Sequence, residues 1–113
     1  MVSMDAVELV AAVTTPPSAT DFCEVPKEIS WLHIRSDLIG DIPADWLRAH
    51  FQGRLLYSLR TSRAGGKFER STADRRQRLI TAAADYDLVE LEANDDLRPE
   101  LLDAIPPAKR MVV

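Results

Sequence analysis

Five short apolar runs are spaced along the chain, and polar or helical stretches separate them. The runs occupy residues 8–14, 29–37, 55–61, 86–93 and 110–113. Each has the length of a β-strand, and several are bounded by proline, glycine or charged residues. The pattern therefore predicts five strands.

The stretches between the strands carry helix signals. We expect helices over residues 18–27, 43–51, 71–85 and 96–104. Pro43 suits a first helical turn, and Ser71 or Thr72 can cap the longest helix, with Asp74 in its first turn. Prolines at positions 106 and 107 stop the last helix. Strands that alternate with helices predict an α/β fold with a parallel sheet, built from residues 1–113 as a single domain.

Polar side chains recur on one face of three consecutive predicted strands. They are His33, Arg35 and Asp37 on the second strand, Ser58 and Arg60 on the third, and Glu90 and Glu92 on the fourth. Because alternate strand residues share a face, each set points the same way and lies near the strand's carboxyl end. A doubly wound sheet is apolar on both faces, whereas a (β/α) barrel points alternate side chains inward.

The pattern therefore predicts an inward patch formed by His33, Arg35, Arg60, Glu90 and Glu92. Burial of unpaired charges is costly, so we expect the acids and bases of this patch to pair.

Composition narrows the functional classes. The chain has 113 residues, 46% of them hydrophobic and 28% charged, as in a folded globular domain. Its net charge of −4 argues against a general nucleic-acid binder. The arginines at positions 70, 75, 76 and 78 are expected to form a solvated helix face.

Cysteine usage and the amino-terminal segment bear on compartment and cofactors. One cysteine, Cys23, forms no intrachain disulfide, and no cluster with metal-ligand spacing accompanies it. We therefore expect no metal or cofactor. A signal peptide and a run of membrane-spanning length are both lacking, so a cytoplasmic protein without a membrane partner is expected.

Three segments together resemble type I 3-dehydroquinate dehydratases. The segment LLYSLRTSRAGGKFERS at 55–71 looks like a family strand ending in Phe-Arg-Ser/Thr, followed by a Glu-Gly-Gly loop. WLHIRSD at 31–37 is similar to the family's Glu-Trp-Arg-Xaa-Asp strand, and DLVELEA at 87–93 to its Asp-Leu/Val-Glu strand. Their order and spacing agree, and the resemblance runs from about residue 6 to the end.

The resemblance implies a (β/α)8 barrel and a lyase of the shikimate pathway, hence of aromatic amino acid biosynthesis. Members dehydrate 3-dehydroquinate to 3-dehydroshikimate without a cofactor, through a lysine Schiff base and a histidine base. Arg35 and Arg60 match substrate-contacting arginines, while Asp37 and Glu92 match the acids of the second and fourth strands. His33 stands where the family has a substrate-contacting glutamate. The resemblance thus implies His33, Arg35, Arg60 and Glu92 as substrate-binding residues.

The departures from the family pattern concern catalysis. Ala64 stands where the loop glutamate is expected, and Gly65 and Gly66 match the turn glycines. The family's histidine and lysine lie on or beyond its fifth and sixth strands, outside this chain. Lys27, Lys67 and Lys109 are all misplaced for a Schiff base. The chain is therefore expected to be the first half of a TIM barrel, without catalytic residues and inactive alone.

Several alternatives stay open. The half barrel is a fragment of a longer enzyme (in some relatives fused to a shikimate dehydrogenase), a unit that pairs with a second copy or with the missing half, or a reduced open sheet. A non-catalytic binding or assembly module is the rival function. A flavodoxin-like receiver domain is disfavoured, because the third strand ends in Arg60 rather than in a phosphorylatable aspartate. The Gly65–Gly66 loop lacks the pattern of a phosphate-binding P-loop.

Overall fold

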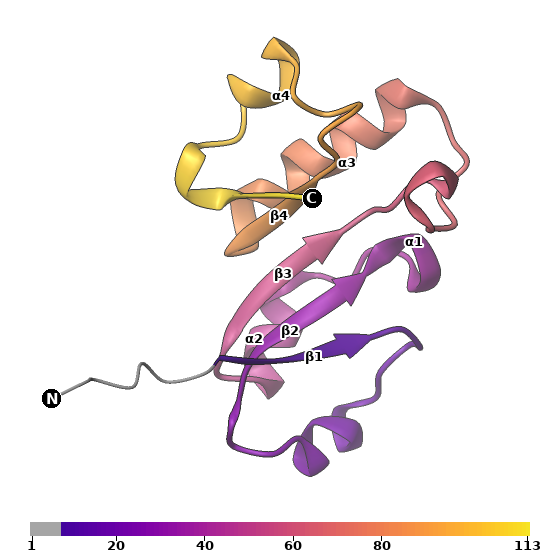
Figure 1. Cartoon of the computed structure of the whole chain (residues 1–113). Coiled ribbons are helices and arrows are strands. Elements are labelled where there is room, and N and C mark those ends of the chain that lie inside the picture. Colours follow the sequence, from indigo (N-terminus) through magenta and orange to yellow (C-terminus); the bar gives the residue numbers. More distant parts are fainter. Residues whose placement is uncertain (1–7) are drawn as a thin grey trace, which may run out of the picture.

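The computed structural model describes residues 8–113 and contains one five-stranded parallel sheet (Figure 1). The strands are β1 (Leu9–Val13), β2 (Ile29–Arg35), β3 (Arg54–Ser58), β4 (Leu88–Leu91) and β5 (Arg110–Val112). They lie in chain order, β1-β2-β3-β4-β5, as consecutive βα units place them. The sheet is open, which is consistent with a partial barrel.

The strand register lines up the residues that share a face. Ala12 pairs with His33, His33 with Leu56, and Leu56 with Leu88. Two residues further along the strands, and on the same face, Arg35 pairs with Ser58. Because all five strands are parallel, their carboxyl ends meet at one edge of the sheet.

Helices cover one face of this sheet. The α-helices are α1 (Ser36–Ile39), α2 (Ala44–His50), α3 (Thr72–Asp85) and α4 (Pro99–Leu102), and the short 3-10 turns are η1 (Ala19–Glu24), η2 (Ser62–Ala64) and η3 (Pro107–Lys109). The core between sheet and helices contains Leu32, Ile34, Leu55, Tyr57, Val89 and Leu91 from the strands and Leu47, Leu79, Ala83 and Leu101 from the helices. All of these strand residues belong to the face opposite the polar patch, as period-two alternation requires.

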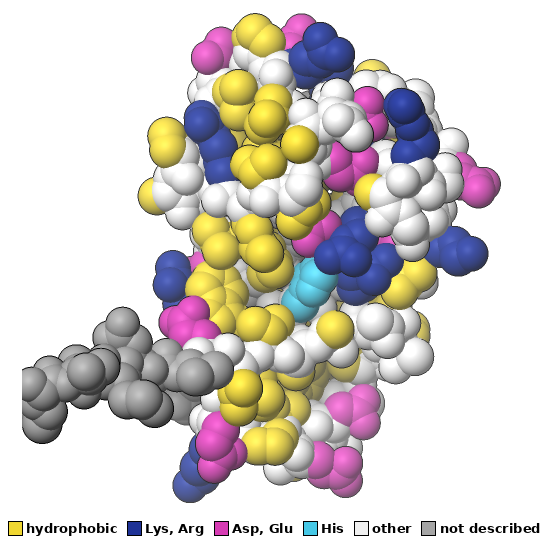
Figure 2. Space-filling view, viewed as in Figure 1, with side chains coloured by type: hydrophobic (Ala, Val, Ile, Leu, Met, Phe, Trp, Pro, Cys, Tyr) yellow, Lys and Arg dark blue, Asp and Glu magenta, His cyan; other side chains and the backbone are white. Residues whose placement is uncertain are grey.

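In the described part of the chain, no helix lies over the other face of the sheet. Figure 2 shows this face, where a histidine lies beside a group of basic and acidic side chains and apolar side chains surround them. Val10 of β1 is 53% exposed and Met111 of β5 is 40% exposed. Among the strands that the structure describes, β1 and β5 each pair with one neighbour, so these two strands form the edges of the sheet.

Several element boundaries differ from the sequence-based expectation. The second strand ends at Arg35, and Asp37 lies in α1, which stops at Gly40 with a φ of 82°. Arg60 lies two residues beyond the last residue of β3. The helix expected over 96–104 is shortened to α4, because Asp96 Oδ2 accepts the Glu92 N–H and holds the preceding residues in a turn. Among residues 8–113, no helix combines the length and apolarity needed to cross a membrane.

Candidate functional site

The centre of the polar patch is an ion pair between Arg60 and Glu90. Arg60 Nε donates to Glu90 Oε1 at 2.7 Å, and Arg60 Nη2 donates to Oε2 at 3.1 Å. The Glu90 side chain is only 2% exposed and that of Arg60 is 31% exposed. Burial disfavours the ionised carboxyl, but hydrogen bonds and charge from Arg60 outweigh it and hold the pKa of Glu90 below its usual value. The expected pairing of acid and base in the patch is confirmed here.

His33 extends this pair across the sheet. His33 Nε2 and Ser58 Oγ share a hydrogen bond of 2.5 Å, and Glu90 Oε2 lies 3.9 Å from the same nitrogen. The Ser58 hydroxyl also helps to lower the pKa of Glu90. Which of the two groups donates in the bond between His33 and Ser58 depends on the tautomer of His33.

The environment favours the neutral form of His33. Its pKa is lowered mainly by burial, and the charges of Arg60 and Arg35 add to that effect while Glu90 opposes it. His33 is therefore an uncharged imidazole at neutral pH, and it faces the open side of the sheet beside two guanidinium groups.

Arg35 forms a second pair at the same edge. Arg35 Nε and Nη2 donate to the two oxygens of Asp37 at 3.0 and 2.8 Å. Asp37 Oδ2 also accepts the backbone N–H of Lys67 at 3.1 Å, which ties the loop after β3 to the end of β2. Burial opposes ionisation of Asp37, but these hydrogen bonds lower its pKa on balance. We call His33, Arg35, Ser58, Arg60 and Glu90 the strand-end cluster.

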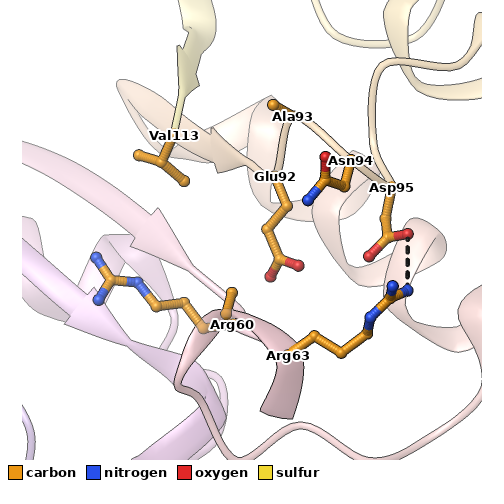
Figure 3. Close-up of a pocket in the computed structure, with 8 residues that line it drawn as sticks. Arg60, Arg63, Glu92, Ala93, Asn94, Asp95 and Val113 are labelled. Carbon is orange, nitrogen blue, oxygen red and sulfur yellow. Dashed lines mark ion pairs between the residues drawn. The ribbon is translucent and has the colours of Figure 1, made fainter.

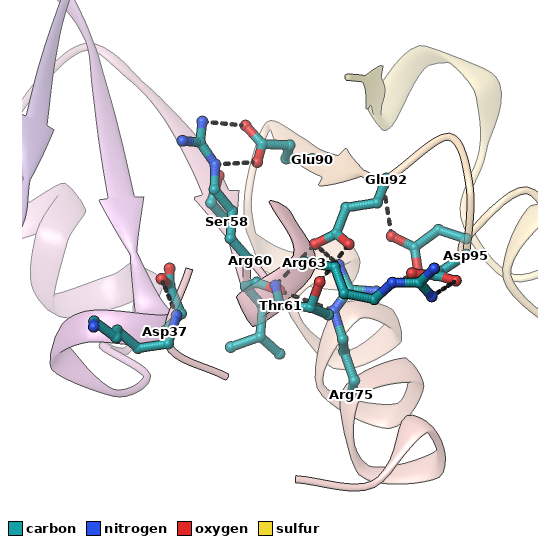
Figure 4. Close-up of polar contacts among 12 residues, drawn as sticks. Asp37, Ser58, Arg60, Thr61, Arg63, Arg75, Glu90, Glu92 and Asp95 are labelled. Atoms are coloured by element: carbon teal, nitrogen blue, oxygen red, sulfur yellow. Dashed lines mark hydrogen bonds and ion pairs between the residues drawn. The ribbon is translucent and has the colours of Figure 1, made fainter. Parts of the chain in front are cut away.

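Glu92 lies next to the strand-end cluster, but its oxygens are engaged within the protein. They accept hydrogen bonds from Thr61 N at 2.9 Å, Thr61 Oγ1 at 2.8 Å and Arg75 Nη2 at 3.1 Å (Figure 4). Arg75 also donates to Leu59 O at 2.8 Å and pairs with Asp96. Glu92 thus joins the end of β4 to the start of α3 and to the residue after Arg60.

The prediction that Arg75 lies on a solvated face of the helix is wrong. Its residue exposure is 4%, because its guanidinium points into the junction of β3, α3 and the loop after β4. A helix-surface pattern alone gives no sign of this burial. The partner Asp96 follows the fourth strand in a loop, so only the tertiary arrangement brings the two side chains together.

The two loop glycines perform different tasks. Gly65 has a φ of 82°, the left-handed conformation that glycine adopts without strain. At Gly66 a Cβ atom would lie 2.1 Å from the backbone oxygen of Arg60. The loop therefore packs directly on the backbone of Arg60 and fixes where its side chain begins.

A hollow of about 400 Å³ opens beside Arg60 at the carboxyl edge of the sheet (Figure 3). That volume lies within the range of small-molecule sites. Arg63 and Asn94 line it together with Arg60 and Glu92, and Arg63 forms an exposed ion pair with Asp95 at 3.6 Å. Sequence reasoning did not single out Arg63 or Asn94, which lie in loops after β3 and β4.

The arrangement provides hydrogen-bond donors rather than a net charge. Arg35 and Arg60 each use the Nε and Nη2 edge for a carboxylate, and neither Nη1 has a protein acceptor within residues 8–113. The free end of each guanidinium can donate to an oxyanion or a hydroxyl. In the same part of the chain, no three His, Cys, Asp or Glu side chains are grouped to hold a metal ion.

Within residues 8–113, no lysine side chain forms a hydrogen bond or ion pair with the strand-end cluster. Lys109 Nζ donates to the carbonyls of Ala83 at 2.6 Å and Tyr86 at 3.1 Å, where it caps the carboxyl end of α3. Lys67 is exposed in the loop after β3, and Lys27 is exposed ahead of β2. The structure thus brings His33, Arg35 and Arg60 together with Glu90, and it places Glu92 beside them.

Comparison with known proteins gives a structural relationship. The sequence matches no family model, and no curated protein matches it significantly. A solved structure similar to this chain is the 3-dehydroquinate dehydratase from Aquifex aeolicus VF5, with a TM-score of 0.53 and 15% sequence identity. The match covers 76% of this chain and 42% of that enzyme, so the chain spans less than half of its length. At this identity the likeness shows a related α/β fold.

Proposed function

We propose that this chain is the substrate-binding half of a 3-dehydroquinate dehydratase-like barrel, and that it binds but does not dehydrate by itself. The observation that carries the proposal is the strand-end cluster. It presents two guanidinium groups with free Nη1 ends at the carboxyl edge of a parallel sheet, which is where (β/α) barrels bind their substrates. The fold of the Aquifex enzyme supports the same interpretation.

The charges of the cluster favour a hydroxylated monoacid. Arg60 and Arg35 are each balanced by one carboxylate, so the site has little excess positive charge for a polyanion. Free guanidinium N–H groups suit one carboxylate and several hydroxyls, and Glu90 and Asp37 retain lone pairs for hydroxyl donors. A quinate-like polyhydroxylated carboxylate meets these requirements.

Calorimetry with quinate tests binding. We expect weak, saturable binding that Arg60→Lys reduces about tenfold, because lysine keeps the charge beside Glu90 but loses the planar fork. Arg48→Lys is the matched control, since Arg48 also donates to a carboxylate, Asp87, but belongs to α2. Absence of binding, or equal losses in both variants, would contradict the proposed binding role.

Borohydride trapping with 3-dehydroquinate tests the absence of dehydration. A Schiff base needs a lysine next to the bound ketone, and Lys109 is occupied by carbonyls of α3. We expect no covalent adduct at Lys27, Lys67 or Lys109 by mass spectrometry. A substrate-dependent adduct on any of them would overturn the claim of inactivity.

A second candidate function is an assembly module that completes a barrel with a second copy or with another half. The observation in its favour is the uncovered sheet face, with Val10 and Met111 exposed and the outer edges of β1 and β5 unpaired among residues 8–113. Sedimentation equilibrium over a range of concentrations tests this. Self-association that Val10→Asp and Met111→Asp abolish supports the module, and a monomer at all concentrations excludes pairing of identical copies.

A further inference from the structure

A second hollow lies between the start of α3 and the loop that follows β4. Its volume is about 360 Å³, and four arginines, two threonines and two aspartates line it. We call it the helix-start hollow. It is built from the α3 side of the molecule, and neither the proposed function nor the resemblance assigns it a role.

The acids of the helix-start hollow are already paired. Asp96 binds Arg75 and the backbone N–H of Glu92, and Asp95 lies 3.6 Å from Arg63. The other two arginines, Arg76 and Arg98, have no carboxylate within 4.0 Å among residues 8–113. Within these residues Arg76 and Arg98 are therefore unpaired, and the hollow has one positive charge in excess when Glu92, the second carboxylate on Arg75, is counted.

Arg76 provides an independent sign of a missing acceptor. Its Nε is enclosed by the protein, yet it has no hydrogen-bond partner in the described part of the chain. Buried N–H donors are nearly always paired in folded proteins, because an unpaired donor has lost water without gaining a replacement. Arg76 thus has an unpaired donor among residues 8–113, and its side chain also lines the hollow.

The beginning of α3 adds further donors to the same place. Ser71 Oγ accepts the N–H of Asp74 at 3.1 Å, so the cap serves one amide of the first turn. Thr72, the first residue of the helix, lines the hollow. Helix starts favour anions because their free amides and the helix dipole both present positive potential.

We propose that the helix-start hollow binds the phosphate group of a small phosphorylated molecule. Two arginines without a carboxylate partner in the described part of the chain can both donate to phosphate oxygens, which guanidinium groups bind in a fixed geometry. The volume accommodates a phosphate together with a small organic group. This site is independent of the strand-end cluster, so failure of one proposal leaves the other standing.

Nuclear magnetic resonance on the whole chain tests the proposal. Inorganic phosphate and methyl phosphate are titrated separately at constant ionic strength, with the Arg76 Nε–H and Thr72 amide signals followed in ¹H–¹⁵N spectra. We expect saturable shifts of both signals with each probe. Arg76→Gln should weaken binding about tenfold, because it removes a charged donor.

Arg70→Gln is the matched control for charge alone. Arg70 precedes the same helix, pairs with Asp74 at 3.6 Å and does not line the hollow, so its loss should change the affinity less than about twofold. Arg98→Gln should behave like Arg76→Gln, and it replaces that variant if Arg76→Gln does not fold. Absence of saturation, equal weakening by Arg70→Gln, or binding of inorganic phosphate without methyl phosphate would each overturn the proposal.

Discussion

Removing Arg60 should expose how strongly the sheet depends on its pairing with Glu90. In Arg60→Ala the Glu90 carboxylate, 2% exposed, loses both hydrogen bonds from its guanidinium partner. Breaking a buried pair on one side costs about 3–5 kcal/mol. The Arg60 side chain is 31% exposed, so water can enter the space that it leaves. We therefore expect Arg60→Ala to lower the free energy of unfolding by about 2–3 kcal/mol at pH 7.

The pH dependence distinguishes this cause from lost packing. In the intact chain the pKa of Glu90 is lowered, so its contribution to stability is complete above the unfolded pKa near 4.5. Without Arg60, burial raises the pKa of Glu90 above that value, and the native state then takes up a proton as the pH falls. The difference in unfolding free energy between the two proteins should therefore narrow between pH 7 and about 5.

Urea unfolding at several pH values measures this difference. Arg63→Ala is the matched control, because Arg63 lies three residues later with its side chain 78% exposed, and we expect less than about 1 kcal/mol from it. The ring signals of His33 provide a second readout, because its pKa should rise in Arg60→Ala when the nearby positive charge is lost. The reasoning would be refuted if the difference in unfolding free energy between the intact chain and Arg60→Ala did not change with pH. It would also be refuted if Arg60→Ala and Arg63→Ala lowered the unfolding free energy equally.

Further substitutions examine the framework around the cluster. Asp96→Asn should lower the free energy of unfolding by about 2–3 kcal/mol, since it removes one of the two carboxylates that pair with buried Arg75; a loss below about 1 kcal/mol in urea unfolding would contradict this role. Lys109→Met should cost about 1–2 kcal/mol by removing the cap of α3, and unchanged thermal stability would be the contrary result. Gly66→Ala should lower the free energy of unfolding by about 1–3 kcal/mol, because its Cβ meets the Arg60 carbonyl. Gly65→Ala, where a Cβ has open space, should lower it by about 1 kcal/mol through its positive φ alone. A larger loss in Gly65→Ala than in Gly66→Ala would contradict the roles given to the two glycines. The lowered pKa of His33 makes the native state bind fewer protons, so stability should fall as the pH drops below about 6.5, and His33→Gln should flatten this slope in a pH series.

The alternation of apolar and polar residues was enough to predict the parallel sheet and its polar face. His33, Arg35 and Arg60 were placed correctly at the carboxyl edge because period two and strand direction are local properties. The same logic extended the second strand through Asp37. That extension was wrong, because Asp37 turns into α1 and closes back on Arg35.

The sequence did not specify which acid of the polar patch pairs with which base. Glu90 was assigned to the patch, but its bidentate contact with Arg60 depends on the register of β3 and β4, 30 residues apart in the chain. In the sequence, Arg75 has the pattern of a surface arginine, but the packing of α3 against the sheet buries it. Whether Glu92 contacts a ligand stays a prediction, and in the structure its oxygens accept hydrogen bonds from Thr61 and Arg75.

The sequence by itself determined the alternation of strands and helices, the face of the sheet on which charges lie, and the glycine turn after Arg60. These follow from side-chain periodicity and from backbone conformation, which act between near neighbours. The tertiary structure alone decided which acid neutralises which arginine and which guanidinium ends stay free. Those outcomes depend on distances of a few ångströms between separate elements, because desolvation makes a charge costly and only a partner at hydrogen-bond distance offsets that cost.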